Sequence, residues 1–321
     1  MTASRRALLA FALACASAQV PAQTYPSQPV KIVVPFPAGG TADVLARLLA
    51  DRLTKRWGQP VTVDNKPGGG TVIGTAFVAK APPDGHTMLI MAGSFVINAK
   101  LRTDLPYPGL KAFEPVAGMA YSPQVIAVPP NSPYRTFADW VADAKARPGT
   151  VSIGSVGPAT TQHIASEMLQ RGLGIKLIYT PFQGGAPAVT AAMGGHVHSV
   201  MANLSEMTGQ LEGGRLRALA VTSRERVDSL KQVPTVAESG VAGYEANAWF
   251  GYVVPAGTPP DVIAKIAEGV RAALAEPDVH QRIAGLGMHT MYMDPKAFAA
   301  HIAEEYAKYS RTIDEARIKP E

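Results

Sequence analysis

The 321-residue chain is short of cysteine and has no long hydrophobic run, and each shortage excludes a class of protein. Its single cysteine, Cys15, lies in an N-terminal segment that we expect to be removed, so the mature chain would contain no disulfide. A membrane-spanning helix needs about 20 consecutive apolar residues, and neither the run after Arg6 nor any later segment is long enough. Lipidation of Cys15 is an alternative, but Ala12-Leu13-Ala14 before it fits the lipidation motif poorly.

Motifs of several enzyme and cofactor sites are missing as well. The sequence has no Gly-Lys-Ser/Thr phosphate loop and no Gly-x-Ser-x-Gly nucleophile turn. Gly68–Gly74 is close to a dinucleotide-binding fingerprint, but its last gap is one residue too long and no strand-end acid follows at the required distance. His196 and His198 would share one face of a strand, but no cysteine or acid stands nearby at ligand spacing. We therefore expect no catalytic residue, no metal and no cofactor.

Charged residues make up only 17% of the chain, with 30 Lys and Arg against 25 Asp and Glu and a net charge of +5. No run of five or more basic residues occurs, and no basic strip carries interleaved aromatic residues. Because such patterns are typical of nucleic-acid-binding proteins, we expect no nucleic-acid partner.

The first 22 residues have the three-part layout of a secretory signal. Arg5 and Arg6 form the basic part, Ala7–Ala16 the apolar part, and small residues up to Ala22 precede a cleavage site near Gln23. The twin arginines also match a twin-arginine signal weakly, so the export route stays open. We expect a mature protein that is soluble in the periplasm.

The mature sequence opens with a strand, a Gly-Gly turn and an amphipathic helix. Val30–Val34 has the composition of a buried strand, and Gly39 and Gly40 follow it. Glycines let the backbone approach a ligand, and the free N–H groups at a helix start attract negative charge. Thr41 or Asp43 is the expected N-cap. The alternative is a tight strand-to-helix connection that binds nothing.

The same alternation continues along the chain and predicts an α/β protein with parallel strands. Glycine-containing loops are expected at 154–158 and 181–185, an irregular segment at 277–292, and caps at Asp261 and Asp294. The further strands are expected at 60–63, 87–91, 151–153, 176–179, 197–202 and 216–221, and the further helices at 71–80, 137–146, 161–170, 186–193, 259–275 and 295–316.

Two extended apolar segments, 116–128 and 244–254, interrupt this pattern. We interpret them as crossovers between two domains, because the chain is longer than one average domain. Residues 23–124 and 246–321 would form the first domain, and residues 125–245 a second domain inserted into it. The two crossovers would act as a hinge, a layout that suits closure on a ligand.

Three glycine-containing loops, at 38–40, 154–157 and 183–185, follow predicted strands. Ligands of open α/β sheets bind at the carboxyl ends of strands, so these loops predict one binding cleft between the domains. Within it, Asp43 is either a helix cap or a ligand contact. Trp249 and Phe250 either stack on a ligand or pack at the domain junction.

The loops of the expected cleft carry few cations, and Lys66 is the only lysine or arginine in them. A negatively charged ligand would therefore be held by the backbone N–H groups of Gly39, Gly40 and Thr41, by the helix dipole, and by hydroxyls or water from the opposite domain.

Five motifs, in order along essentially the whole mature chain, resemble the Bug family of extracytoplasmic solute-binding components of tripartite tricarboxylate transporters. They are Pro35–Asp43, Asp64–Gly74, Ala81–Thr87, Gln183–Ala188 and Val233–Gly240. The resemblance implies an α/β, two-lobed type II periplasmic binding protein fold, each lobe a mostly parallel sheet flanked by helices. It also implies a monomer that captures a small carboxylate, namely a di- or tricarboxylate, an amino acid or an aromatic acid, and delivers it to the large and small multi-span membrane subunits of the transporter.

The residue pattern and the resemblance together place the ligand contacts on the loops of the cleft. Pro158–Gln162 departs from the glycine- and serine-rich run usual in the family, so the contacts with the distal end of the ligand stay open. The expected ligand-binding residues are Phe36, Ala38, Gly39, Gly40, Thr41, Asp43, Ser94, Ser155, Thr160, Thr161, Gln183, Gly184 and Asn203.

Two other functions remain as alternatives. One is a binding protein that feeds a sensor kinase, which the sequence of this chain alone does not separate from a transport protein. The other is a periplasmic enzyme acting on a small carboxylic acid, and the missing nucleophile–base pair and metal ligands argue against it.

Overall fold

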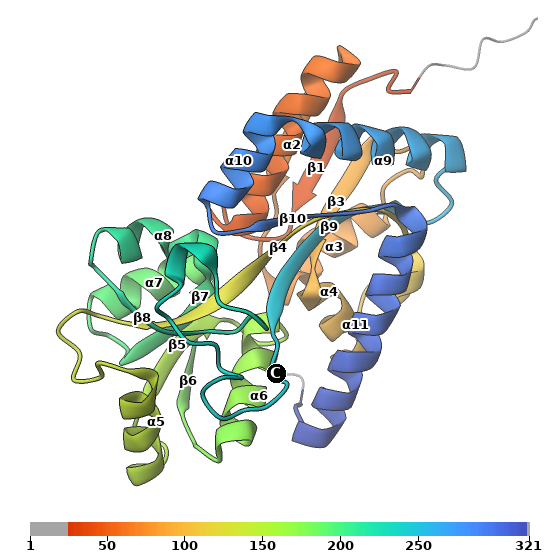
Figure 1. The fold of residues 1–321 in the computed structure, drawn as a ribbon. Helices are drawn as coiled ribbons and strands as arrows, with labels where there is room; N and C mark the ends of the chain where they lie inside the picture. The colour runs from red at the N-terminus through yellow and green to blue at the C-terminus, as the bar shows by residue number, and fades with distance from the viewer. Residues whose placement is uncertain (1–24, 320–321) are drawn as a thin grey trace, which may run out of the picture.

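The computed structural model describes residues 25–319, which form two α/β lobes (Figure 1). One long strand, β4 (Phe113–Val128), runs through both lobes and joins them into a ten-stranded sheet. The main path of this sheet is β2-β1-β3-β9-β4-β7-β5-β6, and β10 and β8 also pair with β4. The predicted signal segment lies outside the described residues.

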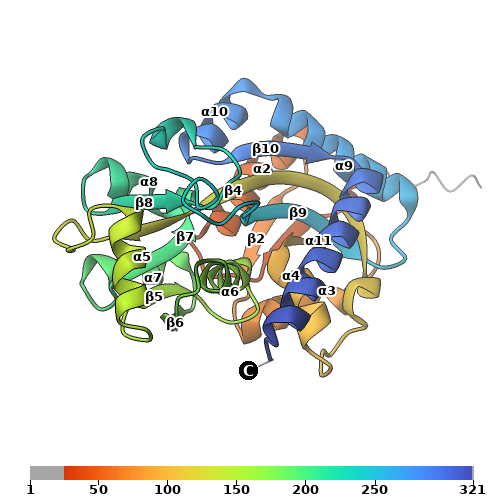
Figure 2. The same cartoon turned by 60° about the horizontal axis from the view of Figure 1, so that its bottom comes forward.

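The first lobe is built on parallel strands. β1 (Val30–Val34) is parallel to β2 (Val61–Asn65) and β3 (Thr87–Ala92), while β9 (Asn247–Pro255) runs antiparallel to β3 and β4. Helices cover both faces of the sheet (Figures 1 and 2). They are α2 (Thr41–Trp57), α9 (Pro260–Ala275) and α10 (Pro277–Gly285) on one face, and α3 (Val72–Ala79), α4 (Gly93–Leu101) and α11 (Pro295–Ala316) on the other.

The strand β1 is apolar except for Lys31, which pairs with Asp64 at 3.6 Å, because both of its faces are otherwise buried. Ile32 and Val34 pack against α2 and α9, whereas Val33 points to the opposite core with α4 and α11. Gly58, in the left-handed conformation, ends α2 as a C-cap. The first strand and helix are therefore fixed on both sides, and the loop between them is held on a rigid frame.

The second lobe repeats the arrangement with β5 (Ser152–Val156) parallel to β6 (Ile178–Phe182) and β7 (Ser199–Asn203). β8 (Arg217–Val221) and β7 run antiparallel to the second half of β4. The helices of this lobe are α5 (Phe137–Ala146), α6 (Thr161–Leu173), α7 (Gly185–Met193) and α8 (Leu204–Glu212).

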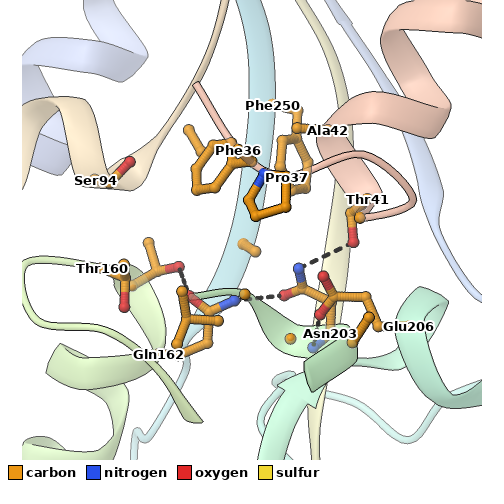
Figure 3. Close-up of a pocket in the computed structure, with 18 of the residues that line it drawn as sticks. Phe36, Pro37, Thr41, Ala42, Ser94, Thr160, Gln162, Asn203, Glu206 and Phe250 are labelled. Atoms are coloured by element: carbon orange, nitrogen blue, oxygen red, sulfur yellow. Dashed lines mark hydrogen bonds between the residues drawn. The ribbon is translucent and has the colours of Figure 1, made fainter. Parts of the chain in front are cut away.

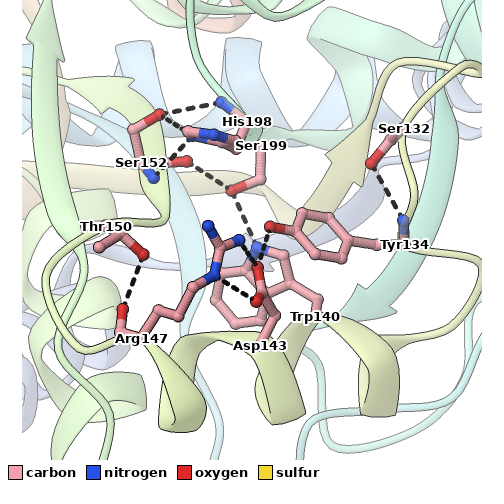
Figure 4. A network of polar contacts seen from close by, with 9 residues as sticks. All are labelled: Ser132, Tyr134, Trp140, Asp143, Arg147, Thr150, Ser152, His198 and Ser199. Carbon is pink, nitrogen blue, oxygen red and sulfur yellow. Dashed lines mark hydrogen bonds and ion pairs between the residues drawn. The ribbon is translucent and has the colours of Figure 1, made fainter.

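A polar network fixes α5 to the sheet of the second lobe (Figure 4). The buried Trp140 indole donates to Ser199 Oγ at 3.2 Å, and Ser199 Oγ donates to the Ser152 carbonyl at 3.0 Å. On the outer side, the Tyr134 hydroxyl donates to Asp143 at 2.6 Å. The indole N–H therefore has a partner inside the lobe, which avoids the cost of burying it unpaired.

The α/β class is as expected, but the sheet is mixed rather than mostly parallel, because the crossover strands β4 and β9 run antiparallel to their neighbours. The segment 277–292 is not irregular: it contains α10 and the strand β10 (His289–Met293), which pairs with β4. The expected loops at 154–158 and 181–185 begin later than predicted, since residues 154–156 and 181–182 continue β5 and β6.

Two of the predicted helix caps are wrong. The N-cap of α2 is Gly40 rather than Thr41 or Asp43, and the N-cap of α9 is Pro259, with Asp261 in the first turn. Asp294 does cap α11, because its side chain accepts a hydrogen bond from the Ala297 N–H at 2.8 Å.

β4 changes partners along its length. Residues 113–123 pair with β9 of the first lobe, and residues 124–128 pair with β7 and β8 of the second. Within residues 25–319, no helix has the length and apolar character that crossing a membrane requires.

Candidate functional site

A cavity lies between the two lobes, at the carboxyl ends of β1, β3, β5, β6 and β7 (Figure 3). Its volume is about 50 Å³. We call it the interlobe cavity. Its lining residues are Phe36, Pro37, Ala38, Gly40, Thr41, Ala42, Ala92, Ser94, Val156, Thr160, Thr161, Gln162, Gly184, Gly185, Ala186, Pro187, Asn203, Glu206, Ala248 and Phe250.

The first-lobe wall of the cavity is the N-terminus of α2. Gly40 caps this helix without a side-chain hydrogen bond, and the first intrahelical bond runs from the Val44 N–H to the Gly40 carbonyl at 3.1 Å. The N–H groups of the first turn therefore have no acceptor within the helix. Thr41 and Ala42 of that turn line the cavity, which makes the wall attractive to an anion.

Asp43 supports this turn from behind. Its carboxylate accepts from the Gly39 N–H at 3.0 Å, from Arg47 at 2.9 Å and from the Asn65 amide at 2.9 Å. Burial alone would raise the pKa of the Asp43 carboxyl, but the hydrogen bonds from Arg47, Gly39 and Asn65 outweigh burial and lower the pKa. Asp43 shapes the loop, and the Gly39 N–H is already engaged.

The second-lobe wall is tied to the first by a chain of side-chain hydrogen bonds (Figure 3). The Thr161 hydroxyl donates to Gln162 Oε1 at 3.0 Å, and the Gln162 amide donates to Asn203 Oδ1 at 3.1 Å. The Asn203 amide donates to the Thr41 hydroxyl at 3.1 Å, and this hydroxyl lies 2.7 Å from Ser205 Oγ. The two lobes therefore meet at Thr41 in this structure.

Glu206 brings a carboxyl group to the same point. It follows β7 in the first turn of α8 and accepts a hydrogen bond from the Asn203 N–H at 3.2 Å. Part of the residue stays accessible in the cavity, but protein atoms of both lobes surround the carboxyl. This desolvation raises the pKa of Glu206 to about 7, against the opposing hydrogen bonds from Asn203 and Thr41.

The structure brings most of the sequence-predicted site residues together. Four of them lie elsewhere, for different reasons. Gly39 and Asp43 bind each other behind the turn, and Ser155 is fully buried within β5, where its hydroxyl donates to the Met201 carbonyl at 2.8 Å. Gln183 lines an adjoining cavity. Those that line the interlobe cavity are Phe36, Ala38, Gly40, Thr41, Ser94, Thr160, Thr161, Gly184 and Asn203.

The sequence left open whether Trp249 and Phe250 of β9 contact a ligand or pack at the domain junction. The structure gives the two residues different roles. Phe250 lines the cavity. Trp249 packs edge-on against Phe298 and donates its indole N–H to Glu305 at 2.8 Å, on the other side of the strand. Adjacent residues of a strand point to opposite faces, so only one of the two reaches the ligand side.

Gln162 and Glu206 line the cavity but were not among the ligand-binding residues expected from the sequence. Gln162 belongs to the segment Pro158–Gln162, which departs from the family pattern. Glu206 had a signal in the sequence: Asn203 and Glu206 have the spacing of a capping box, which places an acid beside the N-terminus of a helix that follows a strand.

No lysine, arginine or histidine is among the residues that line the interlobe cavity. Lys66 is bound to Asp64 at 3.3 Å and lies over the Phe77 ring, outside this cavity. Arg102 and Lys319 line the adjoining cavity together with Gln183. In the part of the chain that the structure describes, no group of three or more histidine, cysteine, aspartate or glutamate residues is arranged to hold a metal ion.

Two α/β lobes with a site between them, joined by strands that cross from one to the other, define a binding protein of the periplasmic type. The family model described as tripartite tricarboxylate transporter family receptor matches residues 45–318. Protein BugT of Bordetella pertussis is 33% identical over 311 residues, which cover 96% of this chain and 95% of BugT. The chain belongs to the tripartite tricarboxylate transporter receptor family, which confirms the resemblance to Bug proteins.

Solved structures have the same fold. The periplasmic binding protein BugD is 32% identical, with a TM-score of 0.87, over 92% of this chain and all of BugD. The R. palustris protein Rpa4515 with adipate is 32% identical, with a TM-score of 0.88 over 92% of this chain and 100% of that one. MatC from Rhodopseudomonas palustris with bound malate is 27% identical, with a TM-score of 0.84 over 90% of this chain and 100% of MatC. The two-lobed binding-protein fold is thereby confirmed.

Proposed function

We propose that this chain is a periplasmic solute-binding protein that captures a small carboxylate in the interlobe cavity and delivers it to the membrane subunits of a tripartite transporter. The observation that carries the proposal is the N-terminus of α2, whose N-cap Gly40 has no side chain and which presents Thr41 and Ala42 to a cavity lined by no cationic side chain. Two related proteins with the same fold hold adipate and malate, both carboxylates.

The carboxylate is held by backbone N–H groups of the first turn of α2 and by side chains of the second lobe. Thr160, Gln162 and Asn203 supply polar groups opposite that turn, and Phe36 and Phe250 supply apolar surface. A dicarboxylate has a second charge, and Arg102 and Lys319 in the adjoining cavity favour this class of ligand. The mode of binding requires no catalytic group, and we propose capture without turnover by a monomer.

We further propose that ligand capture closes the two lobes about a hinge in β4 and the segment leading into β9. The support is the change of partners in β4 near residue 124, which makes the strand a connection between lobes rather than part of one core. Residues 23–124 and 246–321 would move as one body and residues 125–245 as the other.

A thermal-shift screen of the exported protein against carboxylic acids tests the proposed function. A ligand that binds only the folded state stabilises it by RT ln(1 + [L]/Kd), or about 2.7 kcal/mol at a concentration of 100 Kd. We expect adipate, malate or a related di- or tricarboxylate to raise the melting temperature, and uncharged amides of the same acids to leave it unchanged. A panel without any stabilising carboxylate, or turnover of one, would overturn the proposal.

The N-terminal segment predicts where the mature protein begins. The basic, apolar and small-residue order of residues 1–22 predicts a mature protein that begins close to Gln23 and carries no lipid. Intact-mass measurement of the protein recovered from the periplasm should match a chain starting there. A mass that includes a lipid adduct on Cys15 would contradict a soluble periplasmic protein.

A further inference from the structure

The Glu206 carboxyl group lies where three helices begin. Its Oε2 accepts from the N–H of Asn203, the N-cap of α8, and the N–H and hydroxyl of Thr41 at the start of α2 stabilise its ionised form. It also lies against the start of α7, since a Cβ placed on Gly185 would come within 1.9 Å of Oε2. Three positive helix ends therefore face one carboxyl group of the protein itself.

The proposed ligand carboxylate needs the same groups. The first turn of α2 is its expected anchor, and Glu206 lines the same cavity. Two carboxylates that share one enclosed site without a cation repel each other, and one of them takes up a proton. The residues lining this cavity include no cation that would offset a second negative charge.

The elements around Glu206 bring no other ionised group to it. Asp43 of α2 is turned to Arg47 and Asn65. The strand β7 and the helix α7 contain no ionisable side chain, and the remaining ionisable residue of α8, Glu212, lies exposed at its far end. On α6, His163 lies against the Tyr179 ring and does not line the cavity.

We infer that Glu206 determines what the cavity accepts by coupling the capture of a carboxylate to the uptake of one proton. The ionised Glu206 carboxylate and the ligand carboxylate take one proton from water, and in the complex this proton lies in a hydrogen bond between the two groups. One O–H bond breaks in the water or buffer acid that supplies the proton, one O–H bond forms on the carboxyl pair, and no other covalent bond changes. The inference rests on the proposed function, because it concerns the ligand of the same cavity.

Proton uptake on binding makes the affinity for a carboxylate fall as the pH rises. Because binding consumes a proton, it weakens as the pH rises above the pKa of Glu206 in the free protein, about 7. The expected loss is about tenfold per pH unit, so that binding at pH 8.5 is roughly thirtyfold weaker than at pH 6. Carboxylic acids of ordinary pKa, about 4, are ionised throughout this range and contribute no such change.

Calorimetric titration with adipate, malate and aspartate at pH 6 and pH 8.5 tests the coupling. Each titration is repeated in phosphate and in Tris, because the difference in buffer ionisation enthalpy reveals the number of protons taken up. The wild type should take up close to one proton per carboxylate at pH 8.5. Glu206→Gln keeps a capping-box side chain but cannot ionise, so it should take up none and bind equally well at both pH values. Glu212→Gln, on the exposed end of the same helix, should behave as the wild type.

The outcomes separate the two proposals. If a carboxylate binds without proton uptake at pH 8.5, or if Glu206→Gln keeps the wild-type pH dependence, the coupling is wrong while the proposed function stands. If only aspartate binds, without proton uptake, and Glu206→Gln weakens it more than tenfold, Glu206 is an ionised partner of the ligand ammonium group and the coupling is again wrong. If none binds to either protein at either pH, the proposed function fails and the inference falls with it.

Discussion

Replacing Thr41 by proline is expected to weaken carboxylate binding by roughly thirtyfold to several-hundredfold, while Thr41→Ala weakens it by about tenfold or less. Proline removes the backbone N–H and the hydroxyl together, whereas alanine removes only the hydroxyl. A hydrogen bond to a charged group contributes about 1.5–3 kcal/mol, and a neutral one about 0.5–1.5 kcal/mol. The larger loss therefore belongs to the backbone donor.

The fold should tolerate this proline. Thr41 is the first residue of α2, where proline fits the helix and no intrahelical N–H bond is lost. Gly40 before it is extended, with ψ 170°, which suits the residue before a proline. Calorimetric titration with the best carboxylate of the thermal-shift screen compares the two variants, and circular dichroism checks that both are folded. Equal affinities of Thr41→Pro and Thr41→Ala would show that the backbone does not anchor the ligand.

Gly93→Ala is expected to weaken binding by about 5- to 150-fold without unfolding either lobe. Gly93 begins α4 of the first lobe, and a Cβ there would lie 2.2 Å from Cγ2 of Thr161 in the second lobe. Thr161 is β-branched and stiff, so its methyl group does not move aside easily. Overpacking of this kind costs about 1–3 kcal/mol, and the cost falls on the arrangement in which the lobes meet.

A second substitution distinguishes a clash between the two lobes from a local disturbance of α4. Thr161→Ser removes the methyl group and keeps the hydroxyl, so the Gly93→Ala/Thr161→Ser double variant should regain affinity to within about tenfold of the wild type. Small-angle scattering with and without a saturating carboxylate should show that Gly93→Ala alone stays in the more extended form. If Gly93→Ala binds and compacts like the wild type, the lobes do not close to the arrangement seen here.

The start of the site was predictable because its signals are local. An apolar strand, two glycines and an amphipathic helix follow one another within residues 30–58, and the structure has a strand, a turn and a helix there. The N-cap was misassigned because Asp43 has stronger partners in Arg47 and Asn65 than in its own helix end. Arg47 lies one helical turn further along the same helix, but Asn65 is 22 residues away and its contact is not visible from the sequence around Asp43.

Other parts depend on packing between distant segments. Gly154 was interpreted as a turn residue, but it lies within β5, where a Cβ would come within 3.0 Å of Val197 and 3.1 Å of Phe182. Glycine is present because neighbours are close, not because the chain turns. β10 was missed for a similar reason, since its register with β4 pairs His289 with Tyr121, far away in sequence. The position of Glu206 at three helix ends likewise requires the assembled lobes.

The central claim is that a carboxylate binds at the N-terminus of α2, and a structure of the protein with the best carboxylate of the screen tests it most directly. We predict carboxylate oxygens within hydrogen-bonding distance of the Thr41 and Ala42 N–H groups, with the Glu206 carboxyl group adjacent. A carboxylate held instead by Arg102 or Lys319 in the adjoining cavity, with no ligand group at the first turn of α2, would contradict the account.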